Sequence, residues 1–246
     1  MATVLPNDDT RRPPFETEDL RRLLTELLDT PFAGSDGASM PVGHYRWGVY
    51  AFFDYDGEPI YVGQTNEMLR TRVRRHLTNQ RTDAVAMSVL DPFEVHDIEV
   101  WPLADLQDVY SKNPQTRHLM GTAKAELDAL ERQVTRLAVA KSTFKAILNE
   151  KDPPPGDFEI EIPPSFRGSI VSDAVARLRG HPDFRIARRA LIISRLAQVI
   201  SERKVQGGLR RVLQTQARRL QSLAARRYEG LGGAGSVLTE GEDDEA

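Results

Sequence analysis

Four side chains in the first third of the chain are of types that can act on a phosphate group. Arg72 and His76 are four positions apart, so on a helix they project from one face. An arginine fork can hold a phosphate bidentately, and a histidine can move a proton near neutral pH. Tyr50 and Tyr61 lie in two neighbouring strand-like segments and can reach the same side of a sheet. This combination is suited to phosphodiester chemistry.

The segments that carry these residues have clear local signals. Residues 46–54 are rich in aromatic and β-branched side chains, and residues 59–63 follow after Asp56-Gly57, a strong hairpin signal. Cap residues then lead into a helix over 67–77, which carries Arg72 and His76. Residues 94–101 predict a third strand. We therefore expect an antiparallel hairpin, a basic helix and one further strand.

The rest of the chain reads as mostly helical. Leucines at helical spacing predict a helix after Thr17, and Pro31 ends it. The following residues, 31–45, have loop composition. Further helices are predicted over 117–149, 170–179, 184–205 and 207–229, with Gly207-Gly208 as a break. The fold class predicted is α+β, with a small, mainly antiparallel, three-stranded sheet packed by helices and a mostly helical C-terminal region.

Composition divides the chain into five segments. Proline is concentrated in one stretch, where five of the 15 prolines lie between positions 153 and 164. That stretch is expected to be a stiff linker. The segments are a flexible start with a helix at 1–45, a domain at 46–150, the linker at 151–165, a basic helical region at 166–230 and an acidic, disordered tail at 231–246.

The overall composition excludes several classes of protein. The 246 residues include no cysteine, which excludes a disulfide scaffold, a thiolate zinc site and a cysteine nucleophile. No apolar run approaches the roughly 18 residues that a membrane span needs, and no signal sequence is visible. We expect a cytoplasmic protein that does not bind membranes.

Charge is distributed unevenly along the chain. The formal net charge is -3, yet residues 163–232 carry 15 Lys and Arg against four Asp and Glu. Such segregation raises the question of polyanion binding, with a solvated helix surface as the plain alternative. The residues that we expect to contact a nucleic-acid backbone are Arg70, Arg74, Arg75, Arg211, Arg218, Arg219 and Arg226.

Two tripeptides and the residues after them resemble a known signature. Gly48-Val49-Tyr50 and Tyr61-Val62-Gly63 are separated by ten residues, which resembles the signature of the GIY-YIG nuclease superfamily with Ile replaced by Val in each half. Arg72 and His76 come next in the expected order, then a helical glutamate, Glu131, and an asparagine, Asn149. The resemblance covers about 46–150.

The resemblance implies a metal-dependent nuclease. Members hydrolyse nucleic-acid phosphodiesters with one divalent cation, Mg²⁺ or Mn²⁺, which here would be held by Glu131. Arg72 would hold the scissile phosphate, and Tyr50 or Tyr61 would orient or deprotonate the attacking water with help from His76. Asn149 would orient its neighbours by hydrogen bonding. The family leaves the identity of the general base open, and so does this sequence.

Two of these assignments have alternatives in the sequence. Glu126 lies five positions before Glu131, so the two cannot point the same way on a helix. We favour Glu131, because excision-repair members also place a second glutamate five positions before the metal ligand. Asn149 is further from Glu131 than most members would have it, and it could instead be a helix C-cap.

We therefore expect an endonuclease that acts on DNA, with double-stranded DNA as the first choice and RNA left open. Restriction and phage defence are the settings that fit best, and a mobile-element or repair nuclease fits less well. A restriction enzyme that reads a palindrome would be a homodimer. The alternatives are a non-catalytic nucleic-acid-binding or assembly protein that kept the fold, and a helical interaction protein.

Overall fold

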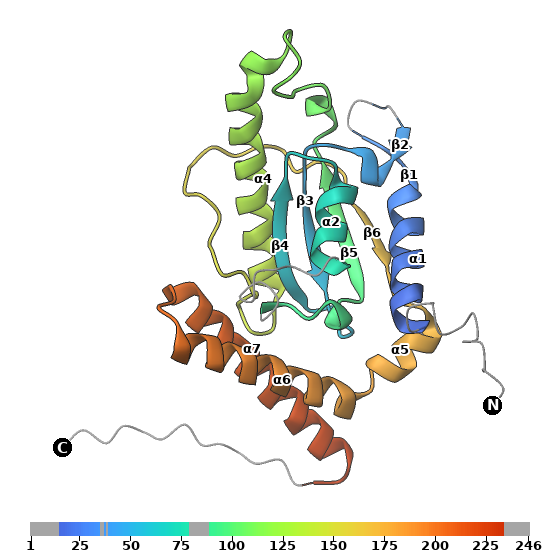
Figure 1. Cartoon of the computed structure of the whole chain (residues 1–246), viewed down its shortest axis with the longest axis vertical. Coiled ribbons are helices and arrows are strands. Elements are labelled where there is room, and N and C mark those ends of the chain that lie inside the picture. Colours follow the sequence, from blue (N-terminus) through green and yellow to red (C-terminus); the bar gives the residue numbers. More distant parts are fainter. Residues whose placement is uncertain (1–14, 35–36, 38, 79–88, 234–246) are drawn as a thin grey trace, which may run out of the picture.

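A computed structural model describes residues 15–34, 37, 39–78 and 89–233. The first 14 residues lie outside this part, as does the predicted acidic tail of 231–246 except for its first three residues. The chain folds as an antiparallel sheet with helices on both faces and a helical pair packed across one end (Figure 1). None of the described helices is both long and apolar enough to cross a bilayer.

The main sheet has four strands in the order β4-β3-β5-β6, all antiparallel. Its strands are β3 (Gly48–Phe53), β4 (Pro59–Thr65), β5 (Asp97–Pro102) and β6 (Phe166–Ser169). The first three occupy the predicted segments. The prediction of only three strands is wrong, because β6 returns after the proline-rich stretch and pairs with β5. Its sequence, Phe-Arg-Gly-Ser, has no β-branched residue and so gave no strand signal.

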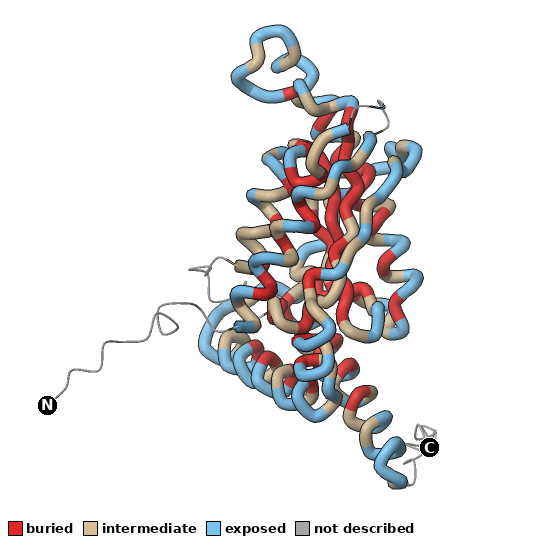
Figure 2. The backbone as a smooth tube through the Cα atoms, turned by 90° about the vertical axis from the view of Figure 1, so that its right-hand side faces the viewer, coloured by how far each residue is buried: buried red, intermediate tan, exposed pale blue. Residues whose placement is uncertain are grey.

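Alternation along β3 divides the core into two layers. Tyr50 and Phe52 face one side, where they pack with α1 (Phe15–Asp29), α2 (Leu69–Leu77) and the C-terminal helices. Val49, Ala51 and Phe53 face the other side, against α4 (Met120–Lys141). Because successive strand side chains point to opposite faces, all six β3 residues are buried. Figure 2 shows this burial concentrated in the sheet and in the helix sides that face it.

Two stretches differ from the predicted elements. Residues 31–45, expected as a loop, contain a two-stranded ribbon of β1 (Pro31–Ala33) and β2 (Ser39–Pro41), followed by the 3₁₀ turn Val42–His44. The long helix, expected over 117–149, is α4 and ends at Lys141. Its first predicted residues, Arg117–Leu119, form a 3₁₀ turn instead.

The helix ends early because of a serine. Ser142 Oγ accepts a hydrogen bond from the Phe144 amide at 3.1 Å and donates to the Ala146 carbonyl at 3.0 Å. Such local bonds compete with helix continuation. Phe144 therefore lies beyond the helix, although the predicted helix over 117–149 included it.

Three helices complete the chain: α5 (Asp173–Arg179), α6 (Pro182–Glu202) and α7 (Gly207–Gly230). Their positions agree broadly with the sequence prediction, but the predicted break at Gly207-Gly208 is wrong: both glycines belong to the first turn of α7, and the break lies at residues 203–206. The helices α6 and α7 pack as an antiparallel pair across the lower end of the sheet in Figure 1. Ile192, Leu196, Leu209 and Val212 join the core on the Tyr50 side of the sheet.

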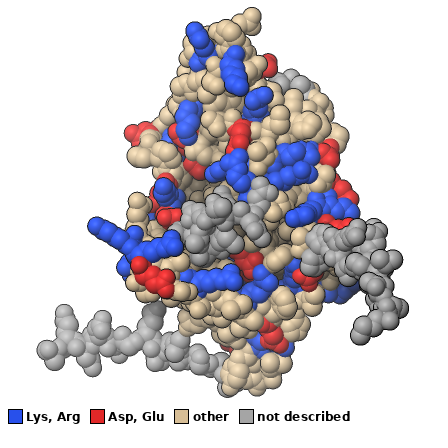
Figure 3. Space-filling view, in the orientation of Figure 1, with Lys and Arg blue, Asp and Glu red and all other residues tan. Residues whose placement is uncertain are grey.

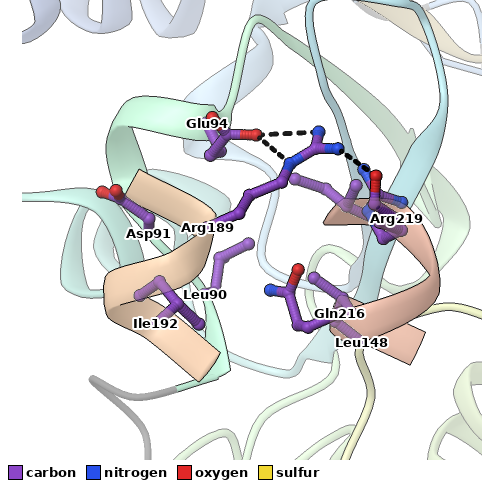
Figure 4. A pocket seen from close by; sticks show the side chains of 9 residues that line it. Leu90, Asp91, Glu94, Leu148, Arg189, Ile192, Gln216 and Arg219 are labelled. Carbon is purple, nitrogen blue, oxygen red and sulfur yellow. Dashed lines mark hydrogen bonds and ion pairs between the residues drawn. The ribbon is translucent and has the colours of Figure 1, made fainter. Parts of the chain in front are cut away.

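The helical pair is also fixed by buried charges. Asp54, at the end of β3, is 2 % exposed and its Oδ2 accepts from Arg185, Arg189 and Arg219 at 3.1, 2.9 and 2.6 Å. Glu94 accepts a further bond from Arg189. Figure 4 shows Arg189 of α6 reaching between Glu94 and the α7 backbone at Arg219.

Asp54 also shapes the hairpin turn. Its Oδ1 accepts hydrogen bonds from the backbone amides of Asp56 and Glu58, at 2.9 and 3.1 Å. One carboxylate therefore shapes the β3–β4 hairpin turn and binds three arginines of the C-terminal helices.

Candidate active site

The two tyrosines lie on the same face of the β3–β4 hairpin. Tyr50 pairs in register with Gly63, and Phe52 pairs with Tyr61. The Tyr50 phenol therefore lies directly over Gly63, where an added Cβ would come within 2.6 Å of the Tyr50 hydroxyl oxygen. At Gly48 a Cβ would come within 2.8 Å of the Trp101 carbonyl oxygen. Both motif glycines are needed for close packing.

Helix α2 brings Arg72 and His76 to the same face. Leu69, Val73 and Leu77 are buried in the core, which fixes the rotation of the helix about its axis. The Tyr50 hydroxyl and Nε2 of His76 are 3.0 Å apart. The Tyr61 ring centroid lies 5.2 Å from that of His76. The two tyrosines therefore lie next to the face of α2 that carries Arg72 and His76, as predicted.

Arg72 lies against the two tyrosines. Burial acts to lower the pKa of Arg72, but the charge and hydrogen bond of Tyr50, with a smaller effect of Tyr61, outweigh it and raise that pKa. The guanidinium is therefore a permanent cation. Its Nε is buried and has no hydrogen-bond partner among the described residues. Buried donors are normally hydrogen-bonded, and an anionic phosphate oxygen is a suitable acceptor for a guanidinium N–H group.

Glu131 approaches from the opposite face of the sheet, on α4. Its side chain is 9 % exposed, and the Gln64 amide donates to its Oε2 at 2.7 Å. Burial raises the pKa of Glu131, and the Gln64 hydrogen bond and the Lys124 charge offset this only in part. The strand β4 lies at the edge of the sheet. Arg72 from one face and Glu131 from the other can therefore approach each other around that edge.

Asn149 lies along that edge. Its Oδ1 accepts from the Val62 amide at 3.0 Å and its Nδ2 donates to the Val62 carbonyl at 2.7 Å. The Leu148 amide also donates to the Ile60 carbonyl, at 2.8 Å. The segment thus pairs with β4 much as a further strand would. Since α4 ends at Lys141, Asn149 is not a helix C-cap.

These residues enclose a cleft of about 500 Å³. Five of the six residues predicted for catalysis line it: Tyr61, Arg72, His76, Glu131 and Asn149. Tyr50, which is 0 % exposed, lies behind them and contacts His76. Glu126, the alternative to Glu131, is half-buried and does not line the cleft. The geometry therefore favours Glu131.

Four residues at this site were not predicted to belong to it. The amide of Gln64 binds both Glu131 and Asp128. Asp128 lies one helical turn before Glu131, a spacing that could have pointed to it. Lys151 and Asp152, assigned to the linker, form part of the cleft wall.

The donor set fits a cation held by few protein ligands. Among the described residues, no group of three or more His, Cys, Asp or Glu side chains could hold a metal. One buried carboxylate at a cleft wall, with a second close by, suits Mg²⁺, which keeps several waters and often uses one or two carboxylates plus substrate phosphate. The residues present therefore fit the cation that the family implies.

The basic residues predicted to contact a nucleic acid have protein partners. On the helix α2 side, Arg70 binds Asp29, Arg74 donates to Thr25 Oγ1 at 2.7 Å, and Arg75 binds Glu67 at 2.6 Å. Basic side chains are spread over the face in Figure 3, with acidic side chains between them. No single uninterrupted basic stripe is visible on that face.

The C-terminal arginines fall into two groups. Arg219 is 2 % exposed and bound to Asp54, so the prediction of a nucleic-acid contact there is wrong. Its face of α7 is turned toward the core, a direction that the spacing alone did not reveal. Arg211, Arg218 and Arg226 are exposed; they bind Asp152, the Phe144 carbonyl and Asp56.

A comparison with protein families finds a match for the part of the chain that contains the hairpin and helix α2. No curated protein and no solved structure matches the chain. Glu131 and Asn149 lie beyond the segment for which a family match exists. That segment, residues 46–104, contains β3, β4, α2 and β5, and it matches the model of the GIY-YIG catalytic domain.

Proposed function

We propose that this protein is an endonuclease that hydrolyses DNA phosphodiester bonds with a divalent metal ion. GIY-YIG domains are typically nucleases, and the matched segment supplies four of the six proposed catalytic residues. The observation that carries the proposal is the cleft at the β4 edge. It places Arg72 and His76 from one face of the sheet opposite Glu131 from the other.

Arg72 is proposed to bind the scissile phosphate. Its cationic guanidinium lines the cleft, and its buried Nε has no acceptor within the part of the chain that the structure describes. A phosphate oxygen would supply the missing acceptor in a charge-assisted hydrogen bond. Binding there would also hold the phosphorus between the helix α2 side and Glu131.

Glu131 is proposed to hold Mg²⁺ or Mn²⁺. The bound ion would stabilise negative charge that develops on the phosphate and the leaving oxygen. Gln64 restrains one carboxylate oxygen of Glu131, and the cleft provides the space for waters and substrate.

Tyr61 and His76 are proposed to handle the proton of the attacking water. Both line the cleft, and their rings are adjacent. Tyr50 is set back from the cleft and holds His76 by its hydroxyl, so its proposed role is positioning. This arrangement leaves Tyr61 and His76 as the two candidates for the general base.

Restriction or phage defence is the proposed setting, with double-stranded DNA as substrate and a homodimer as the active form if the target is palindromic. The C-terminal helices enlarge the molecule around a small catalytic domain, as expected for such an enzyme. The exposed arginines Arg211, Arg218 and Arg226 would add affinity for the DNA backbone that depends on salt.

The test uses supercoiled plasmid and phage genomic DNA with Mg²⁺ or with EDTA. We expect wild-type protein and Glu126→Ala to cut only with Mg²⁺, and Glu131→Ala to be inactive. Discrete fragments would indicate a sequence-specific enzyme, and a smear would indicate a nonspecific one. Intact DNA in every lane, with DNA binding retained, would favour the non-catalytic alternative. Equal cutting by wild type and Glu131→Ala would contradict the assigned glutamate.

A further inference from the structure

Gln64 is the centre of a polar network that the matched family signature does not explain. Its Nε2 donates to Glu131 Oε2 at 2.7 Å and to Asp128 Oδ1 at 2.8 Å. Its Oε1 accepts from Lys124 Nζ at 3.1 Å. A side-chain amide has two N–H donors and a carbonyl acceptor, so each of its polar groups is engaged in this network.

The chemistry of the three partners allows only one orientation of the amide. Two carboxylates lie at the nitrogen end, and both can only accept hydrogen bonds when ionised. An ammonium lies at the oxygen end, and it can only donate. Turning the amide around would place its oxygen against two carboxylates and its N–H groups against a cation. The charges of Lys124, Asp128 and Glu131 therefore fix the direction in which Gln64 donates.

The network also holds two carboxylates side by side. Asp128 and Glu131 are one turn apart on α4, and like charges on such neighbours repel. Lys124 offsets this repulsion by pairing with Asp128, and the Gln64 amide bridges the two carboxylates. Among the described residues, Gln64 is the hydrogen-bond donor to Glu131, and the bond reaches Oε2 alone.

We propose that Gln64, with Lys124 and Asp128, is a positioning group that sets the Glu131 carboxylate for its metal ion. This inference rests on the proposed function, since it takes Glu131 as the metal ligand. Groups that hydrogen-bond a ligating side chain fix its orientation, and removing them typically weakens metal affinity by about 10- to 100-fold.

The test compares Gln64→Met with Gln133→Ala in the full chain. Methionine keeps the length of the side chain but removes the amide. Gln133 is a matched control, because it is on α4 two residues from Glu131 and its amide instead binds the Ile160 backbone. Mn²⁺ alone, titrated without DNA and followed by the electron paramagnetic resonance of the free ion, gives the affinity. Plasmid nicking gives kcat and KM.

We expect Gln64→Met to raise the Mn²⁺ dissociation constant by roughly 10- to 100-fold and to lower kcat, with KM for DNA unchanged. Gln133→Ala should match wild type in both measurements. Circular dichroism confirms that each variant is folded. If Gln64→Met binds Mn²⁺ as wild type does while Glu131→Ala does not, the positioning role is overturned and the metal site stands.

A second pair of variants tests the orientation of the amide. Lys124 is half-exposed, so Lys124→Met is expected to fold even if Gln64→Met does not. It should weaken Mn²⁺ binding, whereas Lys141→Met, at the exposed end of the same helix, should not. Equal Mn²⁺ affinity in both lysine variants would overturn the part assigned to Lys124. Equal affinity in wild type and Glu131→Ala would overturn the metal site itself, and this inference with it.

Discussion

The hydroxyl of Tyr50 and Nε2 of His76 are 3.0 Å apart, and the phenol that makes this contact packs directly over Gly63. The first tyrosine of the signature, the second glycine and the helix histidine are thus one packed unit. Tyr50 is fully buried, so it acts on the cleft through His76. The spacing of the signature follows from strand register, because Tyr50 and Gly63 are cross-strand partners.

Gly63→Ala is expected to lower kcat strongly while leaving the protein folded. The new methyl group would come within 2.6 Å of the Tyr50 hydroxyl oxygen, so the phenol and its contact with His76 must shift. A misplacement of about 1 Å can reduce a rate by about 100-fold. Plasmid nicking measures the effect. Gly121→Ala is the matched control, because a Cβ there meets nothing within 4 Å. Equal activity in the two variants would contradict the packing argument.

Arg218→Met and Arg219→Met should affect different properties, although the residues are adjacent. Arg219 is buried against Asp54, which would keep Arg185 and Arg189 in the variant. Losing this one charge-assisted hydrogen bond should lower the free energy of unfolding by about 1.5–3 kcal/mol. Arg218 is exposed, and its replacement should change stability by no more than about 0.5 kcal/mol.

Urea denaturation measures the stability of both arginine variants. DNA binding over a series of salt concentrations then measures the phosphate contact proposed for Arg218. Its loss should reduce the slope of log K against log salt by about 0.9. A wild-type slope in Arg218→Met would remove this residue from the DNA surface, and a wild-type stability of Arg219→Met would contradict its structural role.

Asn149→Ala is expected to reduce activity by releasing the segment that pairs with the edge of β4. The variant loses two hydrogen bonds to Val62, which together contribute about 1–3 kcal/mol to stability. Thermal unfolding and plasmid nicking are the measurements. Asn113→Ala is the matched control, since that amide bonds within the 108–116 loop. If both asparagine variants cut DNA equally well, Asn149 is not needed to shape the cleft.

Asp56 is expected to make stability depend on pH in strongly acidic solution. Burial alone would raise the pKa of Asp56, but the hydrogen bonds and charges of Arg185 and Arg226 lower it to about 2, from 3.8 in the unfolded chain. Because the folded value is depressed, the stabilisation is present above 3.8 and is lost as pH falls toward 2. The effect is modest, since the side chain is 37 % exposed.

Asp56→Asn is the variant that isolates this dependence. Urea denaturation between pH 5 and about 2 should show the stability difference from wild type shrinking as the pH falls. A difference that stays constant across this window would show that Asp56 does not titrate with a depressed pKa in the folded protein.

Local patterns in the sequence were sufficient for the hairpin, helix α2, strand β5 and the C-terminal helices. Asp56-Gly57 favours a hairpin turn, the aromatic and β-branched content of residues 46–54 favours a strand, and the four-residue spacing of Arg72 and His76 places them on one helix face. These are properties of short segments, and neighbouring residues determine them. The strand β6 could not be found in this way, because its pairing with β5 joins segments about 70 residues apart.

The composition of the site was partly visible in the sequence, and its arrangement was not. Residue types and order pointed to Tyr50, Tyr61, Arg72, His76, Glu131 and Asn149. Only the tertiary structure showed that β4 is an edge strand around which both faces meet, that Tyr50 lies behind the cleft, and that Gln64 bridges Glu131 and Asp128.

The charged residues show the same division most clearly. The sequence by itself determined that residues 163–232 are rich in arginine. Only the tertiary structure decided that Arg219 is buried on Asp54 while Arg218 faces solvent. Helical spacing fixes which residues share a face, but the direction of that face depends on contacts with distant segments. The reason is physical, since a buried arginine needs an acid partner, and here that acid is 165 positions away.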